Sequence, residues 1–340
     1  MPVRTLLLIT TIFVLGCQAP EISKTTKLSK KLPYAVGMKK ILLEDSQRNR
    51  SLPVSFWYPA TGESNPRAVN ESIYIRNYGS KEADAKQGRF PLVMLSHGTG
   101  GTAASMLWIA EYLAGHGYWV AGVDHPGDSW PNATPEGLIK VWERPQDLSV
   151  IVYQMQQDER FQEQIDFSRV AALGHSSGGY TVLALAGALY NPADLWQHCA
   201  TKDAMPACNL ADKKVMASTD YSSASNSYKD PRFKAAVVMA PAINPGLTQE
   251  SLSSIDIPIQ LIMSERDELL GDTPNRMAKW VPNVTVTSIP AAGHFVYISP
   301  CNEIGKGQVA QICADSEGVD RAMIQRKLKS SVLGFLNSEL

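Results

Sequence analysis

The segment 174–178, GHSSG, constrains this chain more than any other part of its sequence. An apolar run, 170–173, precedes it, and a run rich in alanine and leucine, 182–186, follows it. This pattern is typical of a nucleophile elbow, in which a serine sits on a strained turn between a buried strand and a helix. The alternative is an ordinary strand-to-helix turn, because G-x-S-x-G also arises by chance in glycine- and serine-rich sequence.

In an elbow, Ser176 is a candidate acyl-transfer nucleophile, because the turn raises its Oγ at a helix N-terminus whose N–H groups can hold an oxyanion. The N–H of Ser177 is the first expected oxyanion donor. The second should come from the glycine-rich loop 96–101, SHGTGG, after the strand 90–95, and we assign it to Thr99. A phosphate-binding role is the alternative, but this loop lacks the lysine of a P-loop and the G-x-G-x-x-G spacing.

A serine of this kind needs an acid and then a histidine downstream, each in a loop after a strand. Asp267 follows the apolar run 257–263, although Glu265, Glu268 and Asp272 compete with it as helix-capping or surface acids. His294 follows the strand 284–289 in a small-residue turn, and we expect it to be the general base, with Asp267 fixing its tautomer. The other histidines are His97, His116, His125, His175 and His198, and only His198 lies downstream of the serine.

Strand-like and helical patterns alternate along residues 34–340, without repeats or a linker, which predicts one α/β domain with a mostly parallel sheet covered on both faces. Such a sheet places its site at the carboxyl ends of the strands. The expected strands are 39–43 and 52–58, which form a hairpin, then 90–95, 118–123, 169–173, 234–239, 257–263 and 284–289. The expected helices are 105–116, 150–161, 275–280 and 319–336.

The N-terminal segment 1–17 has the features of an export signal. Arg4 precedes the apolar run 6–15, which is too short to span a bilayer. The sequence VLGC at 14–17 resembles the lipobox of bacterial lipoproteins, which implies a lipidated Cys17, and Gln18 resembles the outer-membrane sorting pattern. A plain signal peptide with a coincidental cysteine is the alternative. The polar segment 18–33 is then a tether, and we expect the protein in the bacterial cell envelope, anchored by lipid.

Four cysteines remain: Cys199, Cys208, Cys301 and Cys313. An even number of cysteines in a chain expected to leave the cytosol predicts two disulfides. Of the three possible connectivities, loop closure favours near neighbours, which gives Cys199–Cys208 and Cys301–Cys313. A zinc site is the alternative, but apart from a neighbouring histidine nothing supports it. We expect no metal and no cofactor. The formal net charge of −1 gives no electrostatic footprint for nucleic acid.

Several motifs together resemble the α/β-hydrolases of the dienelactone-hydrolase-like and platelet-activating-factor-acetylhydrolase-like group. They are the segments 52–59, 96–101, 123–127, 144–148, 174–179 and 293–295. The resemblance implies an α/β-hydrolase fold from about residue 36 to the C-terminus. Two departures matter: Ser176 replaces the cysteine nucleophile of dienelactone hydrolases, and no carboxylate follows the strand ending at Met239, where animal acetylhydrolases carry their acid. The second departure favours Asp267.

A polar insertion, 187–232, interrupts the domain and is expected to form a disulfide-linked cap over the pocket. Trp130, Trp142 and Trp196 are candidate pocket residues, with core packing as the alternative for each. The chain is thus interpreted as a serine esterase for small or medium acyl esters, with a small-molecule or lipid ester as substrate and no obligate protein partner. Alternatives are a phospholipid deacylase, a polyester or cutin-type hydrolase, a peptidase, and a non-catalytic envelope protein that keeps the fold.

Overall fold

A computed structural model describes residues 32–62, 73–75, 79–209 and 212–340. The expected signal segment, the lipidation site Cys17 and all but the end of the tether lie outside the described residues. The described part belongs to one compact unit, Leu32–Leu340. Among the described residues, no helix combines the length and the apolar character needed to cross a membrane.

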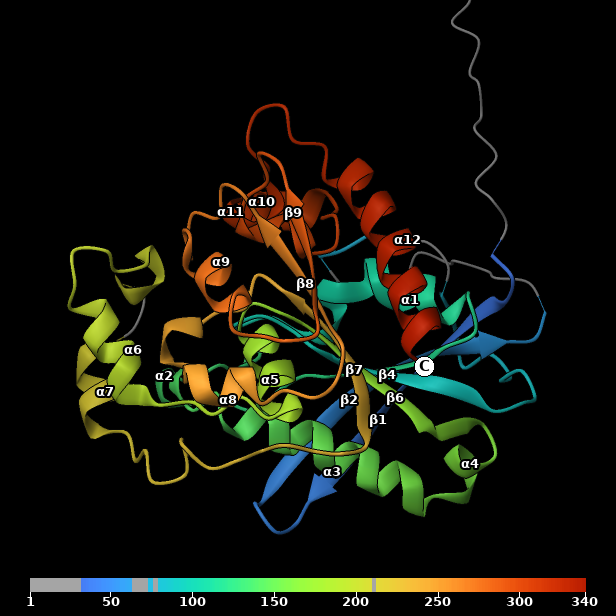
Figure 1. Ribbon diagram of the computed structural model, residues 1–340. Coiled ribbons are helices and arrows are strands. Elements are labelled where there is room, and N and C mark those ends of the chain that lie inside the picture. The colour runs from blue at the N-terminus through green and yellow to red at the C-terminus, as the bar shows by residue number, and fades with distance from the viewer. Residues whose placement is uncertain (1–31, 63–72, 76–78, 210–211) are drawn as a thin grey trace, which may run out of the picture. The chain divides into compact units, whose positions relative to one another are not determined.

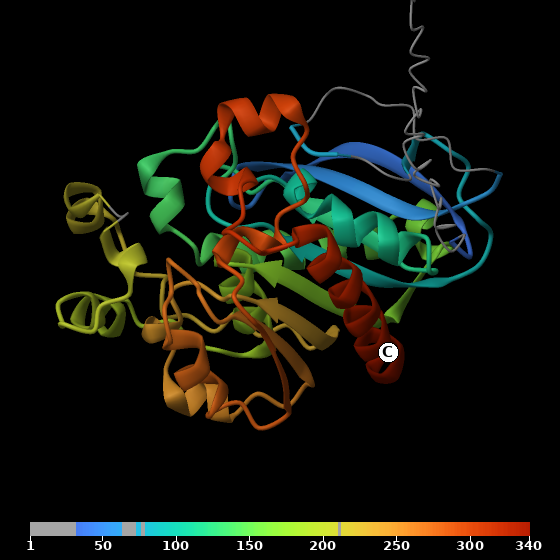
Figure 2. The same cartoon turned by 90° about the horizontal axis from the view of Figure 1, so that it is seen from above.

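In the described residues, nine strands form one sheet in the order β3-β1-β2-β5-β4-β6-β7-β8-β9. The six strands from β5 to β9 run parallel, and β1 pairs antiparallel with β2, which pairs antiparallel with β5. Figure 2 shows the blue strands β1 and β2 at one end of the sheet and the orange strands β8 and β9 at the other. The strands are β1 Ala35–Asp45, β2 Arg50–Ala60, β3 Gly79–Lys81, β4 Phe90–Ser96, β5 Trp119–Val123, β6 Ile165–His175, β7 Phe233–Met239, β8 Ile259–Ser264 and β9 Val284–Ile289.

The central strands are mostly apolar because both of their faces are covered by helices. All five residues of β5 and all six of β8 are buried. Helix α1 (Leu107–Ala114) contacts α12 (Arg321–Glu339), whereas α3 (Glu143–Gln157) contacts α5 (Ser177–Ala186), which also packs on β4, β6 and β7. Figure 1 shows α1 and α12 together above β4 and β6 in that view, with α3 below them. The predicted α/β fold with a mostly parallel sheet is confirmed.

The remaining helices are short and connect these layers. They are α2 Pro135–Ile139, α4 Glu159–Gln162, α6 Pro192–Cys199, α7 Lys213–Ser218, α8 Gln249–Ser253, α9 Thr273–Ala278, α10 Glu303–Gln308 and α11 Ala310–Cys313, with 3-10 turns at Ala103–Met106, Pro206–Asn209, Asn244–Gly246 and His294–Tyr297.

Several boundaries differ from the sequence predictions. The expected helix 150–161 begins seven residues earlier, at Glu143, and is split at Asp158, whose side chain accepts from Arg160 N–H and starts the separate helix α4. Strand β6 begins at Ile165 rather than Arg169, and the expected helix 105–116 opens with a 3-10 turn before α1. Element ends are the least certain part of pattern reading, because caps and tertiary pairing decide them.

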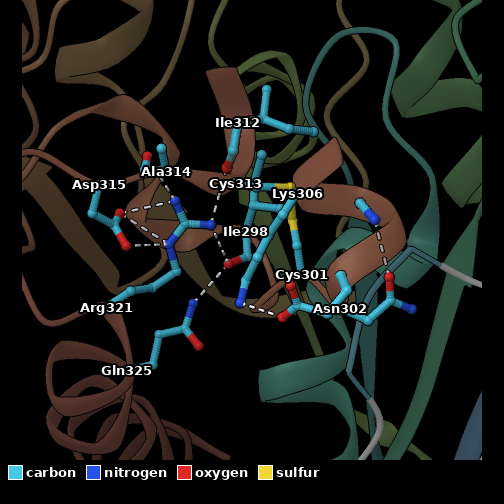
Figure 3. Close-up of a disulfide and its surroundings, with 12 residues drawn as sticks. Ile298, Cys301, Asn302, Lys306, Ile312, Cys313, Ala314, Asp315, Arg321 and Gln325 are labelled. Atoms are coloured by element: carbon cyan, nitrogen blue, oxygen red, sulfur yellow. Dashed lines mark hydrogen bonds and ion pairs between the residues drawn. A yellow bond between two sulfur atoms is a disulfide. The ribbon is translucent and has the colours of Figure 1, made fainter. Parts of the chain in front are cut away.

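Both predicted disulfides are present: Cys199 joins Cys208 and Cys301 joins Cys313. The second one lies beside the buried guanidinium of Arg321, as Figure 3 shows. Arg321 donates to the carbonyl oxygen of Ile312 at 3.0 Å and pairs with Asp315 at 2.8 Å. The start of α12 is thereby fixed to the disulfide-bonded loop that follows His294.

Candidate active site

The turn at Ser176 has the backbone of a nucleophile elbow. Ser176 lies between β6 and α5 with φ 57° and ψ −119°, a positive-φ conformation that L-residues rarely adopt. Its flanking glycines are required: a Cβ on Gly174 would lie 2.1 Å from the carbonyl oxygen of Gly178, and a Cβ on Gly178 would lie 1.9 Å from that of Ser96. Backbone therefore packs against backbone on both sides of Ser176.

The structure brings the three predicted catalytic side chains into one hydrogen-bonded row. Ser176 Oγ lies 2.9 Å from His294 Nε2, and His294 Nδ1 lies 2.8 Å from Asp267 Oδ2. Ser176 is 8% exposed and His294 1%, so the row is nearly closed to water. Because a carboxylate can only accept, we assign the tautomer with Nδ1–H donating to Asp267, which leaves Nε2 to accept from Ser176.

None of the three competing acids is hydrogen-bonded to His294 Nδ1 in the described structure. Glu268 Oε2 accepts from the backbone N–H of His294 at 2.8 Å rather than from its ring. Glu265 is exposed and Asp272 accepts from the Asn275 amide. Asp267 is held by its second oxygen, Oδ1, which accepts from the N–H of Leu269 at 3.0 Å and of Leu270 at 2.8 Å. Oδ2 is therefore left to face the imidazole.

His175, next to Ser176, contacts the loop that carries His294. Its Nε2 lies 3.0 Å from the carbonyl oxygen of His294, and the two rings lie 4.8 Å apart. Burial, together with the neighbouring His294, holds the pKa of His175 well below its usual range. A neutral His175 with Nε2–H donating to that carbonyl fits both observations.

The loop assigned to the oxyanion site meets the elbow. The hydroxyls of Thr99 and Ser177 are hydrogen-bonded to each other, and a Cβ on Gly98 would lie 3.2 Å from Ser176 Cβ. The carbonyl oxygen of Gly98 accepts from Gly101 N–H at 3.0 Å, so it points into the loop. Because a trans peptide directs N–H and C=O oppositely, the N–H of Thr99 points out of the loop. Among the described residues, neither this N–H nor that of Ser177 has an acceptor.

The three candidate pocket tryptophans have different surroundings. Trp142 is 2% exposed and packs against Tyr190 and Tyr221, which favours core packing over a role in the pocket. Trp130 is 72% exposed, and its N–H donates to the carbonyl oxygen of Gly100 in the loop 96–101. Trp196 is 39% exposed on α6.

The insertion 187–232 carries α6 and α7, seen in yellow at the left of Figure 1, and the Cys199–Cys208 disulfide. It touches the acid loop, because Ala207 N–H donates to the carbonyl oxygen of Leu269 at 2.9 Å. That the insertion covers the substrate pocket stays a prediction. His198 accepts from Met205 N–H, and among the described residues no group of three or more His, Cys, Asp or Glu side chains could hold a metal.

Sequence reasoning missed a group of buried polar residues behind the loop 96–101. They are Arg144 and Asp147 on α3 and His125 after β5, each 1% exposed or less. His125 is hydrogen-bonded to Asp147, and Arg144 donates to the carbonyl oxygen of His97 in the loop. The segments 123–127 and 144–148 had drawn attention as motifs, and the charged residues in them were the available signal.

The profile of the Alpha/beta hydrolase family matches residues 92–304. Cutinase 2 of Thermobifida cellulosilytica is 34% identical over 96 residues, which cover 28% of this chain and 33% of the cutinase. The match thus spans a third of the length of this curated relative. Among solved structures, a ferulic acid esterase from Streptomyces cinnamoneus superimposes with a TM-score of 0.62 at 19% identity, covering 92% of this chain and 91% of that chain. At that identity the likeness establishes the shared fold.

Proposed function

Because this chain belongs to the alpha/beta hydrolase family, we propose that it is a serine hydrolase that cleaves carboxylic esters through an acyl-enzyme on Ser176. The observation that carries the proposal is the row from Ser176 Oγ through His294 to Asp267, with hydrogen bonds of 2.9 and 2.8 Å. Nucleophile, base and orienting acid are in hydrogen-bond reach of one another, as acyl transfer requires.

In the first half-reaction, Ser176 Oγ attacks the ester carbonyl carbon while its proton passes to His294 Nε2. Asp267 stabilises the resulting imidazolium through Nδ1–H, and the N–H groups of Ser177 and Thr99 receive the oxyanion. His294 then returns the proton to the alkoxide as the C–O bond to the alcohol breaks. In the second half, water attacks the acyl carbon, His294 takes the proton of that water, and the acid leaves with Ser176 regenerated.

The proposal is tested with a fluorophosphonate probe and with p-nitrophenyl esters of increasing acyl length. We expect the probe to label Ser176 and the folded Ser176→Ala variant to lose both labelling and turnover. Ser168→Ala is the matched control, because Ser168 is exposed near the amino end of β6, away from the turn that follows this strand. A folded wild type that the probe does not label overturns the proposal.

A second candidate substrate class is a polyester of the cutin type. The observation in its favour is the 34% identity with a cutinase over 96 residues, and the 72% exposure of Trp130 beside the loop 96–101 offers an aromatic surface at the protein boundary. Release of soluble acids from a cutin or polyester film, compared with turnover of p-nitrophenyl butyrate, distinguishes the two. Turnover of the soluble ester with no film hydrolysis excludes the polyester class.

We also propose that the protein is exported and anchored through a lipid on Cys17, which the lipobox-like 14–17 and the disulfides in the exported part support. Labelling with radioactive palmitate in a bacterial host tests this. We expect label on the wild type and none on Cys17→Ser. Unlabelled wild-type protein, cleaved elsewhere in the segment, contradicts the anchor.

A further inference from the structure

A second Ser–His–Asp row lies buried behind the loop 96–101. Ser96 Oγ lies 2.9 Å from His125 Nε2, and His125 Nδ1 lies 2.9 Å from Asp147 Oδ2. It repeats the bonding order of the row at Ser176, but all three residues are 0% exposed. A substrate cannot reach Ser96, so this row holds structure and is no second reaction centre.

The charge of Asp147 is balanced from the β1–β2 hairpin. Arg48 Nη2 donates to its Oδ1 at 2.7 Å, and Arg50 donates to both of its oxygens at 2.9 Å. Burial raises the pKa of Asp147, but the hydrogen bonds from His125 and Arg50 outweigh burial and lower it to about 2. The ionised carboxylate takes Nδ1–H of His125, whose Nε2 then accepts from the hydroxyl of Ser96.

Arg144, three residues before Asp147 on the same face of α3, reaches the loop itself. Its Nη1 donates to the carbonyl oxygen of His97 at 2.8 Å, and its Nε lies 2.9 Å from Asp128 Oδ2. Asp128 Oδ1 in turn accepts from Gly100 N–H at 2.8 Å. Arg144 and Asp128 are each 1% exposed, so water does not compete for these contacts.

The two groups held by Arg144 and Asp128 lie on either side of the peptide that joins Gly98 to Thr99. The carbonyl of His97 belongs to the peptide before Gly98, and the N–H of Gly100 belongs to the peptide after Thr99. The peptide between them carries the Thr99 N–H, and its own carbonyl is held inward by Gly101. With both neighbours fixed, that peptide cannot rotate without breaking a buried, charge-assisted hydrogen bond.

We propose that Arg144 and Asp128 are positioning residues that hold the Thr99 N–H toward the oxyanion formed at Ser176. The inference rests on the proposed ester hydrolysis. Neither side chain touches substrate, so the pair acts through the loop. Deleting an oxyanion donor costs about 10²–10³ in kcat, and a donor that is present but misdirected should cost less, about 10- to 100-fold. KM should stay within about twofold, because the contact forms only in the transition state.

The test compares Asp128→Asn and Arg144→Met with the double variant that carries both changes. Asp128→Asn keeps volume and an acceptor for Gly100 N–H, but it removes the negative charge that forms the ion pair with Arg144. The double variant avoids leaving a buried carboxylate unpaired, and so it keeps the test decisive if Arg144→Met does not fold. Asp230→Asn is the matched control: Asp230 is 7% exposed, pairs with Arg232 and contacts Ser149 on α3.

Two measurements are taken on each folded variant, with p-nitrophenyl butyrate as substrate and phenylboronic acid as inhibitor. The boronic acid forms a tetrahedral adduct on serine whose oxygen occupies the oxyanion position. We expect kcat to fall and the inhibition constant to rise by similar factors, while Asp230→Asn leaves both at wild-type values. A purely structural role would lower the melting temperature without this parallel change.

Wild-type kcat and boronate affinity in folded Asp128→Asn and in the double variant overturn the inference, and so does a rise in KM at constant kcat. Either result leaves the proposed function intact, because the wild type still hydrolyses the ester. If the wild type itself neither hydrolyses the ester nor binds the boronate, the proposed function fails and the inference fails with it.

Discussion

The substitution Asp267→Asn tests the assignment of the acid most sharply, because the structure fixes how the new amide must lie. Asp267 Oδ1 accepts from the N–H groups of Leu269 and Leu270, at 3.0 and 2.8 Å. An asparagine has one acceptor oxygen, and two backbone donors will claim it. Its NH2 group then takes the place of Oδ2 and faces His294 Nδ1, where it can only donate.

A donor at that position reverses the tautomer of His294. Nδ1 must accept from the amide, so the proton moves to Nε2, which can no longer take the proton of Ser176. In a serine triad of another fold, the same exchange lowers kcat about 10⁴-fold, which corresponds to about 5.4 kcal/mol of transition-state stabilisation. We expect a loss of that order here, with KM nearly unchanged and the melting temperature within a few degrees of the wild type.

Steady-state hydrolysis of p-nitrophenyl butyrate at pH 8 measures the effect, with thermal unfolding as a check on folding. Glu265→Gln is the matched control, since Glu265 is exposed and two residues away, and its carboxylate accepts from Ser288 Oγ at 3.4 Å rather than from His294. We expect it to keep wild-type turnover. Near wild-type turnover in Asp267→Asn together with loss in Glu265→Gln refutes the assignment of the acid.

Three further predictions concern stability. Gly178→Ala should destabilise the protein by about 3 kcal/mol or more in urea unfolding, since its Cβ would lie 1.9 Å from the Ser96 carbonyl oxygen, whereas helix propensity alone predicts stabilisation. Replacing Cys301 and Cys313, 12 residues apart, by serine should cost about 3 kcal/mol; an unchanged denaturation midpoint contradicts this. Burial, with Arg144 nearby, lowers the pKa of His125 to about 4, and the pKa of Asp147 is about 2. Both bind fewer protons folded than unfolded, so the free energy of unfolding should fall by at least about 2 kcal/mol from pH 6.5 to pH 3, and a flat profile argues against a neutral His125 in the fold.

The elbow, the sheet and the order of the candidate catalytic residues were predictable because each leaves a local signal. Apolar strands covered on both faces read as continuous runs, and a strained turn between strand and helix demands glycines two residues before and after the serine. The pairing of near-neighbour cysteines follows from loop closure in the same way. These signals depend on residues that are close together in the chain.

The sequence favoured Asp267 over Glu265, Glu268 and Asp272, but separating these four acids by contact needed the tertiary structure. All four occupy one short segment, and only the two backbone donors at Leu269 and Leu270 and the approach of His294 decide which carboxylate faces the imidazole. Trp142 likewise reads as a pocket residue or a core residue until its neighbours are known, and its contacts with Tyr190 and Tyr221 place it in the core.

Local patterns in the chain were thus enough to predict the strand–turn–helix unit around Ser176, the α/β fold and the downstream order of acid and histidine. The contact between His294 and its acid, and the contacts of Arg144 and Asp128 with the loop that carries Thr99, depend on the folded arrangement. The physical reason is that those contacts join segments brought together by the sheet: His294 meets Ser176 across 118 residues of chain, and Arg144 meets His97 across 47. Hydrophobic periodicity and turn residues report on local structure, and they do not predict contacts between residues so far apart in the chain.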